Sequence, residues 1–225
     1  MAFAKRALII AWKDLLAEGR RKEGVNALAF FAVLLLFIFQ FALGPDRERL
    51  EAAASGLLWL GFALTGVLGF SRAFQAEMEN ECFEGLLLYP GDRGALYLGK
   101  LGGNLLFILA VELFLLPLFA VFFNFDLLRS LSSLLLIVFL GTLGFSCVGT
   151  LFSAMTAHVR ARELLFPLLV LPITIPALLA SVKSTEVILA GGPFGEALPW
   201  VKLLLGFDVI FFVVCLFAFE FVVEE

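Results

Sequence analysis

The sequence has little charge and few of the residues that bind metals. Charged residues make up 16% of its 225 residues, whereas ordinary soluble domains carry about 25%. It holds one histidine, His158, and three widely spaced cysteines, Cys82, Cys147 and Cys215. No CxxC, CxxCH or zinc-binding spacing links these cysteines, and one histidine cannot supply two axial haem ligands within one chain. We therefore expect no catalytic, metal-binding or cofactor-binding residues in this chain alone.

An excess of positive charge is also missing. The net charge of −4 and the isoelectric point near 5.2 argue against nucleic acid as a partner, because nucleic acids select strongly basic surfaces. A separate soluble catalytic domain is excluded as well, since the length leaves room for about six membrane spans and little more. The chain is therefore predicted not to be an enzyme.

Apolar residues dominate what remains. They make up 62% of the chain, with 27 phenylalanines and a mean hydropathy of +1.04. The few charges are clustered and leave apolar stretches of about 20 residues, the length at which a helix crosses ~30 Å of hydrocarbon. We predict a single-domain, all-α polytopic membrane protein surrounded by lipid. Its six expected spans are 25–43, 52–70, 98–122, 131–155, 164–181 and 201–219.

The basic residues predict the orientation of these spans. With the N-terminus inside, 11 of the 16 lysines and arginines fall on the cytoplasmic side and 5 on the outer side. Positive charge favours cytoplasmic loops, so both termini and the loop 71–97 are expected in the cytoplasm.

Two segments outside the spans have their own patterns. In residues 1–24, Leu8, Ile9 and Trp12 cluster on one side of a helical wheel, which predicts an amphipathic helix in the membrane interface. The alternative is a cytoplasmic helix packed on the rest of the protein. Residues 182–200 are mixed in character, and we expect them to dip into or pack on the outer membrane surface without crossing it.

The loop 71–97 is the longest polar segment between spans. Residues 72–88 favour a helix with an apolar ridge at i, i+4 spacing beside several carboxylates. Pro90 and Gly91 then end it. Such a ridge suits a groove with basic residues around it, although a solvated loop helix is the alternative.

A second pattern near this loop needs separate treatment. Residues 94–100, Gly-Ala-Leu-Tyr-Leu-Gly-Lys, match the spacing of a phosphate-binding loop. Leu101 stands where that motif needs Ser or Thr for magnesium, and no strand precedes it. We interpret these residues as the start of a membrane helix that does not bind ATP.

Two acidic residues, Glu112 and Asp208, fall inside predicted spans. Burying an ionisable group at such depth in a membrane costs free energy, so each of these residues is a candidate for a functional role. They could pair with a partner, line a polar cavity or relay protons. The structural alternative is hydrogen bonding in the protonated form, with Glu112 close to Asn104 or to hydroxyls of the fourth span.

Two further spans have distinct patterns. The fourth carries a stripe of small residues at intervals of four, which favours close helix packing within this chain or with a second copy. These residues are Thr142, Ser146, Thr150 and Ala154. The fifth contains three prolines, Pro167, Pro172 and Pro176. Each removes a backbone donor, so this span is predicted to kink, as a hinge, part of a substrate path or only a structural bend.

Two stretches together resemble a known family. The loop reads Phe74-x-x-Glu77-x-x-Asn80-x-x-Phe83-Glu84-x-Leu86-x-Leu88-x-Pro90, followed by Lys100, and residues 141–181 end in Leu-Pro-x-x-x-Pro. Both are similar to cytochrome c maturation protein B, also called haem exporter protein B, and the similarity covers most of the chain. Glu81 departs from the family pattern, which more often has Gly there.

The resemblance implies a specific architecture. It makes the chain an ABC-2-type permease-like membrane subunit of an ATP-binding-cassette complex in the inner (plasma) membrane. The loop between the second and third spans would be a cytoplasmic coupling helix seated in a separate ATPase. The residues that would contact that ATPase are Phe74, Glu77, Met78, Glu81, Phe83, Glu84, Leu86, Leu88 and Pro90.

The resemblance also implies partners and a role. ATP and magnesium would bind in the ATPase subunit, and haem would be handled in the wider complex. Expected partners are a haem-handling membrane subunit, a small accessory subunit and a second copy of this chain. ATP hydrolysis would drive haem delivery or release of a haem-loaded chaperone on the outer side.

Three alternatives remain from the residues themselves. The first is an export permease of the same architecture for a lipid or drug. The second is an ion-coupled secondary transporter that uses Glu112 and Asp208 and needs no ATPase. The third is a structural membrane anchor.

Overall fold

The computed structural model describes residues 2–20, 22–44, 47–71, 93–125, 131–157, 159 and 161–222. Every regular element in these ranges is an α-helix. They are α1 (Ala2–Arg20), α2 (Lys22–Leu43), α3 (Arg47–Phe70), α6 (Arg93–Phe123), α7 (Leu131–Thr156), α8 (Arg162–Leu189) and α9 (Phe194–Val222).

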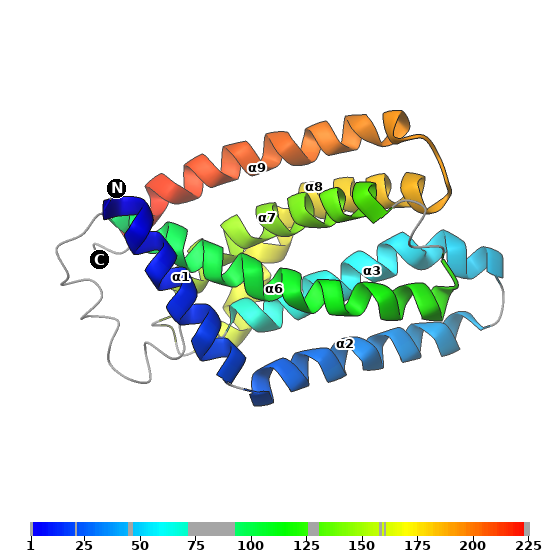
Figure 1. Cartoon of the computed structure of the whole chain (residues 1–225), viewed down its shortest axis with the longest axis horizontal. Coiled ribbons are helices and arrows are strands. Elements are labelled where there is room, and N and C mark those ends of the chain that lie inside the picture. The colour runs from blue at the N-terminus through cyan, green and yellow to red at the C-terminus, as the bar shows by residue number, and fades with distance from the viewer. Residues whose placement is uncertain are drawn as a thin grey trace.

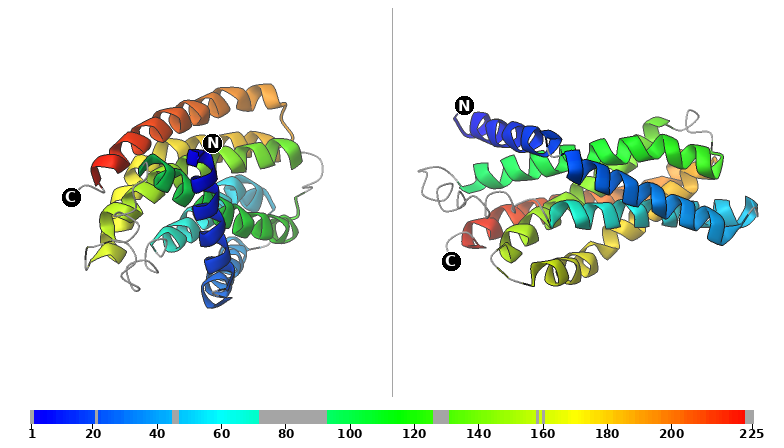
Figure 2. Two further views of the ribbon diagram at one scale, coloured as in Figure 1. Left: turned by 60° about the vertical axis from the view of Figure 1, so that its left-hand side comes forward. Right: turned by 90° about the horizontal axis from the view of Figure 1, so that it is seen from below.

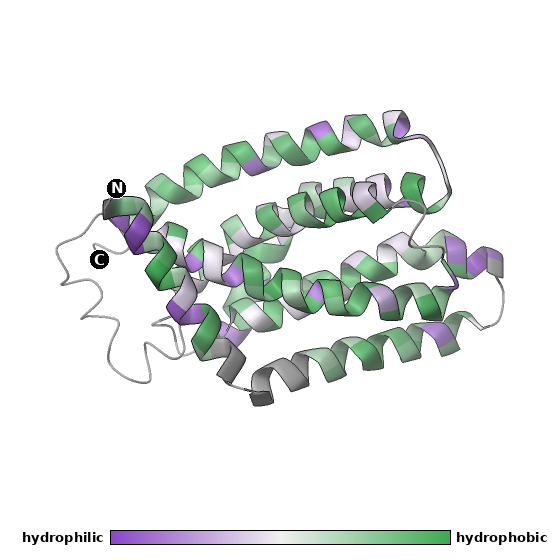
Figure 3. Cartoon of the chain, viewed as in Figure 1, coloured by the Kyte–Doolittle hydropathy of each residue, from purple (hydrophilic) through white to green (hydrophobic). Residues whose placement is uncertain are grey.

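Among the described helices, α2, α3, α6, α7, α8 and α9 lie side by side along the long axis of the molecule and alternate in direction (Figure 1). The described residues begin and end at the same end of this bundle, where α1 crosses the start of α6 (Figures 1 and 2). Apolar residues cover the bundle along most of its length, whereas hydrophilic residues gather on α1 and at helix ends (Figure 3).

Length and composition agree with a multi-pass membrane protein. Five of the described helices are long and apolar enough to cross a membrane, namely α3, α6, α7, α8 and α9. In α2 the apolar part measured among the described residues, Ala29–Leu43, is shorter than a span. Five spans are therefore supported directly, and the sixth, through α2, stays a prediction.

The predicted boundaries change at two places. Residues 182–200 are mostly helical, because α8 continues to Leu189 and α9 begins at Phe194; their place at the outer membrane surface stays a prediction. Within α8 the Ser184 hydroxyl donates to the Ala180 carbonyl at 2.8 Å. Only a short turn separates the two helices, with Gly191 at a φ of +75° that glycine adopts without a Cβ clash.

The loop 71–97 is also shorter than predicted. Its last five residues, 93–97, form the first turns of α6. The helix therefore begins five residues before the predicted membrane span, which starts at residue 98. The predicted coupling helix falls in residues 72–92, which lie outside the described residues.

Helix α7 is the most enclosed of the five candidate spans and packs against α3, α6, α8 and α9. Glycines on α7 permit these close approaches. A Cβ at Gly141 would overlap the Trp59 ring of α3, and a Cβ at Gly144 would overlap the Asp208 carboxylate of α9. The core therefore consists of large side chains from the surrounding helices set against small positions of α7.

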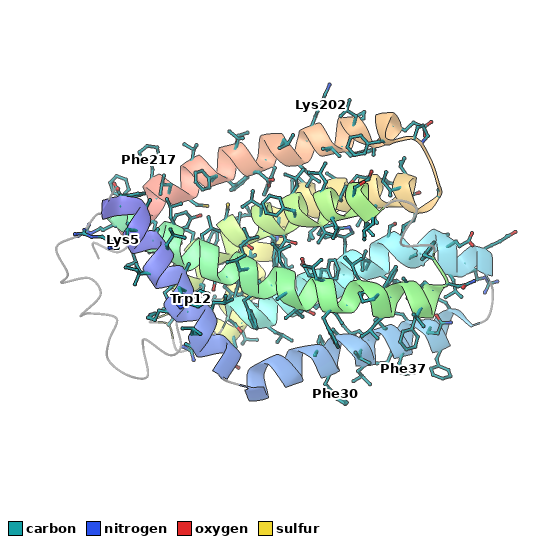
Figure 4. All side chains as sticks on the ribbon, viewed as in Figure 1. Lys5, Trp12, Phe30, Phe37, Lys202 and Phe217 are labelled. Carbon is teal, nitrogen blue, oxygen red and sulfur yellow. The ribbon has the colours of Figure 1, made fainter. Side chains whose placement is uncertain are left out.

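Helix α1 has two different faces. Ile10 and Ala11 lie against glycines of α6, whereas Leu8, Ile9 and Trp12 are exposed at 70%, 59% and 63%. Trp12 points away from the bundle, as do Phe30 of α2 and Phe217 of α9 (Figure 4), whereas Phe37 packs edge to face on Phe122 of α6. One side of α1 thus contacts the protein, and the apolar side predicted from the helical wheel is uncovered.

Candidate functional site

The predicted ATPase-contacting residues, Phe74, Glu77, Met78, Glu81, Phe83, Glu84, Leu86, Leu88 and Pro90, lie outside the described residues. What the structure describes is the pair of helices that flank them. Helix α3 ends at Phe70 and α6 begins at Arg93, and both of these ends are at the end of the bundle that carries the termini (Figure 1). Any partner bound by residues 72–92 would therefore adjoin α3 and α6.

The start of α6 is attached to the end of α9. The Arg93 guanidinium donates to the Glu220 carbonyl at 3.3 Å, and the ring of Tyr97 packs on Phe219 with 5.3 Å between centroids. The buried Tyr97 hydroxyl also donates to the Cys147 carbonyl of α7 at 3.1 Å. The first turns of α6 are thus bonded to two other helices.

Glu112 lies fully inside the bundle and accepts a hydrogen bond from Thr142 of α7 at 2.5 Å. Its exposure is only 2%. The prediction that Glu112 lies near a hydroxyl of the fourth span is confirmed by this contact. The bond joins α6 to α7, and an unbonded polar group at this depth would be costly.

The stripe on α7 faces α6 at two of its positions. Besides the Thr142 bond, Thr150 accepts a hydrogen bond from the Asn104 amide at 3.1 Å. Ser146 and Ala154 are buried, and the Ser146 hydroxyl has no hydrogen-bond partner among the described residues. These bonds place Thr142 and Thr150 at a contact within the chain.

Asp208 has a different environment. It is 4% exposed and lies against Gly144 of α7. Neither carboxylate oxygen has a hydrogen-bond partner among the described residues. Since positions two apart on a helix point in nearly opposite directions, Thr142 with Glu112 and Gly144 with Asp208 lie on opposite sides of α7. The two acids therefore do not form a carboxylate pair.

The three prolines of the fifth span all lie within α8, which is assigned as one helix from Arg162 to Leu189. Pro172 and Pro176 are exposed, whereas Val170 and Thr174 on the other side are buried. Pro172 and Pro176 thus lie toward the outside of the bundle, whereas Pro167 is half-buried. Their role as a hinge stays a prediction.

Sequence reasoning missed several polar contacts between helices. Trp59 of α3 donates to Thr185 of α8 at 2.9 Å. Lys100 of α6, only 1% exposed, forms an ion pair of 3.1 Å with Asp14 of α1. The one sequence signal at this place was the glycine- and lysine-containing run 94–100. Those residues are helical, in agreement with the interpretation that they form no phosphate-binding loop.

The described part of the chain contains no group of three or more His, Cys, Asp or Glu residues that could hold a metal ion. Cys147 and Cys215 are free and buried, in an apolar cluster with Tyr97 and Phe219. Several of the described polar contacts instead join one helix to another. Together the fold and these contacts define a multi-pass helical membrane protein whose buried polar groups hold its helices in place.

Comparison with known proteins identifies the family. Residues 5–225 match the family described as CcmB protein, and the chain belongs to this family. The heme exporter protein B of Pseudomonas aeruginosa is 30% identical over 195 residues, 87% of this chain and 86% of the relative. That of Haemophilus influenzae is 29% identical over 194 residues, 86% of this chain and 84% of the relative. That of Rhodobacter capsulatus is 33% identical over 157 residues, 68% of this chain and 69% of the relative.

Proposed function

We propose that this chain is the membrane subunit of an ATP-binding-cassette haem export complex that serves cytochrome c maturation. The observation that carries the proposal is the family match over residues 5–225, joined to a bundle of apolar, membrane-length helices. Relatives named heme exporter protein B cover most of the chain. The complex lies in the inner membrane, with both termini of this chain in the cytoplasm.

ATP hydrolysis takes place in a separate cytoplasmic ATPase, which binds residues 72–92. Support comes from the end of α3 and the start of α6, which flank this segment in the sequence and lie at the end of the bundle where α1 crosses α6 (Figure 1). Its apolar ridge with Glu77, Glu81 and Glu84 fits a groove with basic residues around it. Closure of the ATPase pushes this segment and, through it, α3 and α6.

The chain itself is non-catalytic and binds no cofactor. Haem is handled by a separate membrane subunit, and a small accessory subunit and a second copy of this chain complete the complex. ATP turnover drives haem delivery or release of the haem-loaded chaperone on the outer side. The second copy follows from the two ATPase subunits that sandwich nucleotide in such complexes.

The test combines complementation with purification. A tagged chain is expressed in a strain that lacks its own copy, cytochrome c is measured by its covalently bound haem, and the complex is purified in mild detergent. Glu84→Arg is compared with Glu196→Arg, an exposed glutamate in the first turn of α9. Both variants make the same charge change, but only the first lies in the proposed ATPase contact.

The proposal predicts that the wild-type chain and Glu196→Arg restore cytochrome c and recover an ATPase together with a haem-handling protein. Glu84→Arg loses the ATPase because a positive charge then faces a basic groove. Recovery of an ATPase without any effect on cytochrome c would indicate an export permease for another substrate. Full activity of Glu84→Arg would contradict the coupling role.

Asp208 keeps a second candidate function open, ion-coupled secondary transport. A buried carboxylate without a hydrogen-bond partner among the described residues is the kind of group that binds and releases protons in transporters. This function predicts loss of transport in Asp208→Asn and Glu112→Gln with no dependence on nucleotide. If both variants mature cytochrome c at the wild-type rate, ion coupling through these acids is excluded.

A further inference from the structure

The crossing of α1 and α6 is unusually close. At Gly99 an added Cβ would lie 2.6 Å from the Ile10 Cβ and 3.0 Å from the Ala7 carbonyl oxygen. At Gly103 it would lie 3.1 Å from the Asp14 Cβ. Distances under about 3 Å to another residue are not tolerated by close-packed interiors. Glycine at these positions therefore lets the backbones of α1 and α6 approach each other.

A charged contact lies beside this apolar one. The Lys100 ammonium pairs with the Asp14 carboxylate at 3.1 Å, and Asp14 also contacts Lys13 at 3.0 Å. Lys100 is almost completely buried, whereas the Asp14 side chain is 15% exposed. A buried ammonium without a carboxylate would be strongly destabilising, so Lys100 holds α1 in one register on α6.

The contact lies within three turns of the start of α6. Residues 93–103 also include Arg93 and Tyr97, which bond to the Glu220 and Cys147 carbonyls of α9 and α7. A helix of 31 residues is ~46 Å long, longer than the ~30 Å hydrocarbon layer. The first turns of α6 and the helix α1 across them thus belong to the boundary region of the membrane.

We propose that Asp14 and Lys100, with Gly99 and Gly103, lock α1 to the start of α6, so that α1 and residues 93–103 move as one rigid unit. Lys100 is a positioning residue: it acts through α1 and contacts no substrate. In the part that concerns transport, the inference rests on the proposed function. Motion delivered to α6 from residues 72–92 would be transmitted to α1 and, through its exposed apolar face, to the membrane surface.

The first experiment replaces the ion pair by a covalent bond. A Cβ at Gly102 would lie 3.5 Å from the Ala11 Cβ, within the range of disulfides. We expect Ala11→Cys with Gly102→Cys to form a disulfide in membranes, measured as protection from a maleimide-polyethylene glycol reagent. The two single variants control for the native cysteines. The oxidised chain should mature cytochrome c at the wild-type rate, because a rigid unit has no internal motion to block.

The second experiment breaks the ion pair and then repairs it. Lys100→Met removes the charge and keeps much of the side-chain volume. Cytochrome c maturation is expected to fall about tenfold, a usual size for coupling between groups in direct contact, while ATP hydrolysis and the amount of assembled complex persist. In the Lys100→Met chain, oxidation of the Ala11→Cys and Gly102→Cys pair should restore maturation, whereas the reduced chain should remain impaired.

The inference is wrong if the disulfide does not form, or if oxidation of the otherwise wild-type pair stops maturation while the complex stays assembled. It is also wrong if Lys100→Met is fully active. These results differ from a failure of the proposed function, in which the wild-type chain itself would not restore cytochrome c. Formation of the disulfide is measured in either case, so the contact between α1 and α6 is tested independently of transport.

Discussion

Thr142 shows how a single hydroxyl determines the environment of a buried acid. It donates to Glu112 at 2.5 Å from the neighbouring helix and so supplies a partner that the apolar surroundings do not. Asp208 of α9 lies against Gly144 of α7, two positions from Thr142. Glycine offers no hydroxyl, and Asp208 has no hydrogen-bond donor among the described residues. Both acids fall inside apolar predicted spans, but the residue that faces each one on α7 differs in whether it provides a hydrogen-bond donor.

Thr142→Val should destabilise the bundle, because it leaves Glu112 without this hydrogen bond while keeping the side-chain volume. Interhelical hydrogen bonds in membrane proteins contribute about 0.6 kcal/mol on average and up to about 1.7 kcal/mol, so the free energy of unfolding should fall by about that amount. It can be measured by denaturation in mixed detergent micelles. Thr142→Ser keeps the hydroxyl and should retain most of the stability; equal losses in both variants would contradict the role of the bond.

Gly141→Ala should also be destabilising, for a steric reason. The new methyl group would overlap the Trp59 ring and lie 2.5 Å from the Ser181 hydroxyl oxygen, and it would displace the indole that bonds to Thr185. Overpacking of this kind costs about 1–3 kcal/mol, measured as a lower midpoint of thermal unfolding in detergent. Gly206→Ala on α9 is the control, since nothing lies within 4 Å of a Cβ there, and it should leave the midpoint unchanged or raised.

Helix α1 shows what determines the position of a helix that does not cross the membrane. The exposed apolar side of α1 favours the membrane interface, while the other side of α1 packs against the glycines of α6. The two readings of residues 1–24 made from the sequence, an interfacial helix and a helix packed on the protein, therefore do not exclude each other. The packing is observed, and the interfacial position stays a prediction.

Gly99→Ala should loosen α1 because the Ala7 carbonyl, a backbone group, cannot move aside alone. Gly102→Ala, one turn away, brings its methyl only into ordinary contact with Ala11 at 3.5 Å. Faster amide hydrogen exchange in α1 is expected for Gly99→Ala and not for Gly102→Ala, in the same detergent and at the same pH. Equal exchange in the two variants would show that α1 does not depend on this close approach.

At the scale of the whole molecule, the described residues begin with α1 and end with α9 at the same end of the bundle (Figure 1). The predicted orientation places 11 of the 16 basic residues on the cytoplasmic side, and this end of the bundle contains the buried Lys100 and the flanks of residues 72–92. The distribution of charge and the packing of the helices thus agree on a polarity for the bundle. Under the proposed function, the ATPase binds at the end of the bundle where α1 crosses α6.

Cysteine labelling in whole cells tests this polarity. With Cys82→Ser to remove one native thiol, Gly195→Cys at the exposed start of α9 should react with a membrane-impermeant maleimide added outside. Lys5→Cys should react only after the membrane is opened. Cys147 and Cys215 are buried and provide the unlabelled background. Labelling of Lys5→Cys in intact cells would show that the predicted orientation is wrong, and a cytoplasmic ATPase could then not bind residues 72–92.

Much of the general architecture could be predicted from hydropathy and periodicity, because the length of an apolar helix is a local property. The helical membrane class, five of the predicted spans, and the contact of Glu112 with a hydroxyl of the fourth span agree with the structure. Residues 182–189 continue α8 and residues 194–200 begin α9, whereas the place of segment 182–200 at the outer membrane surface stays a prediction.

What the sequence by itself determined is therefore the class of protein, the approximate spans and the family. Only the tertiary structure decided that Lys100 pairs with Asp14, that Glu112 and Asp208 lie on opposite sides of α7, and that α1 sits against the start of α6. The physical reason is that these contacts join residues far apart in the chain. They depend on how each helix is rotated and placed against its neighbours, which hydropathy along one segment does not specify.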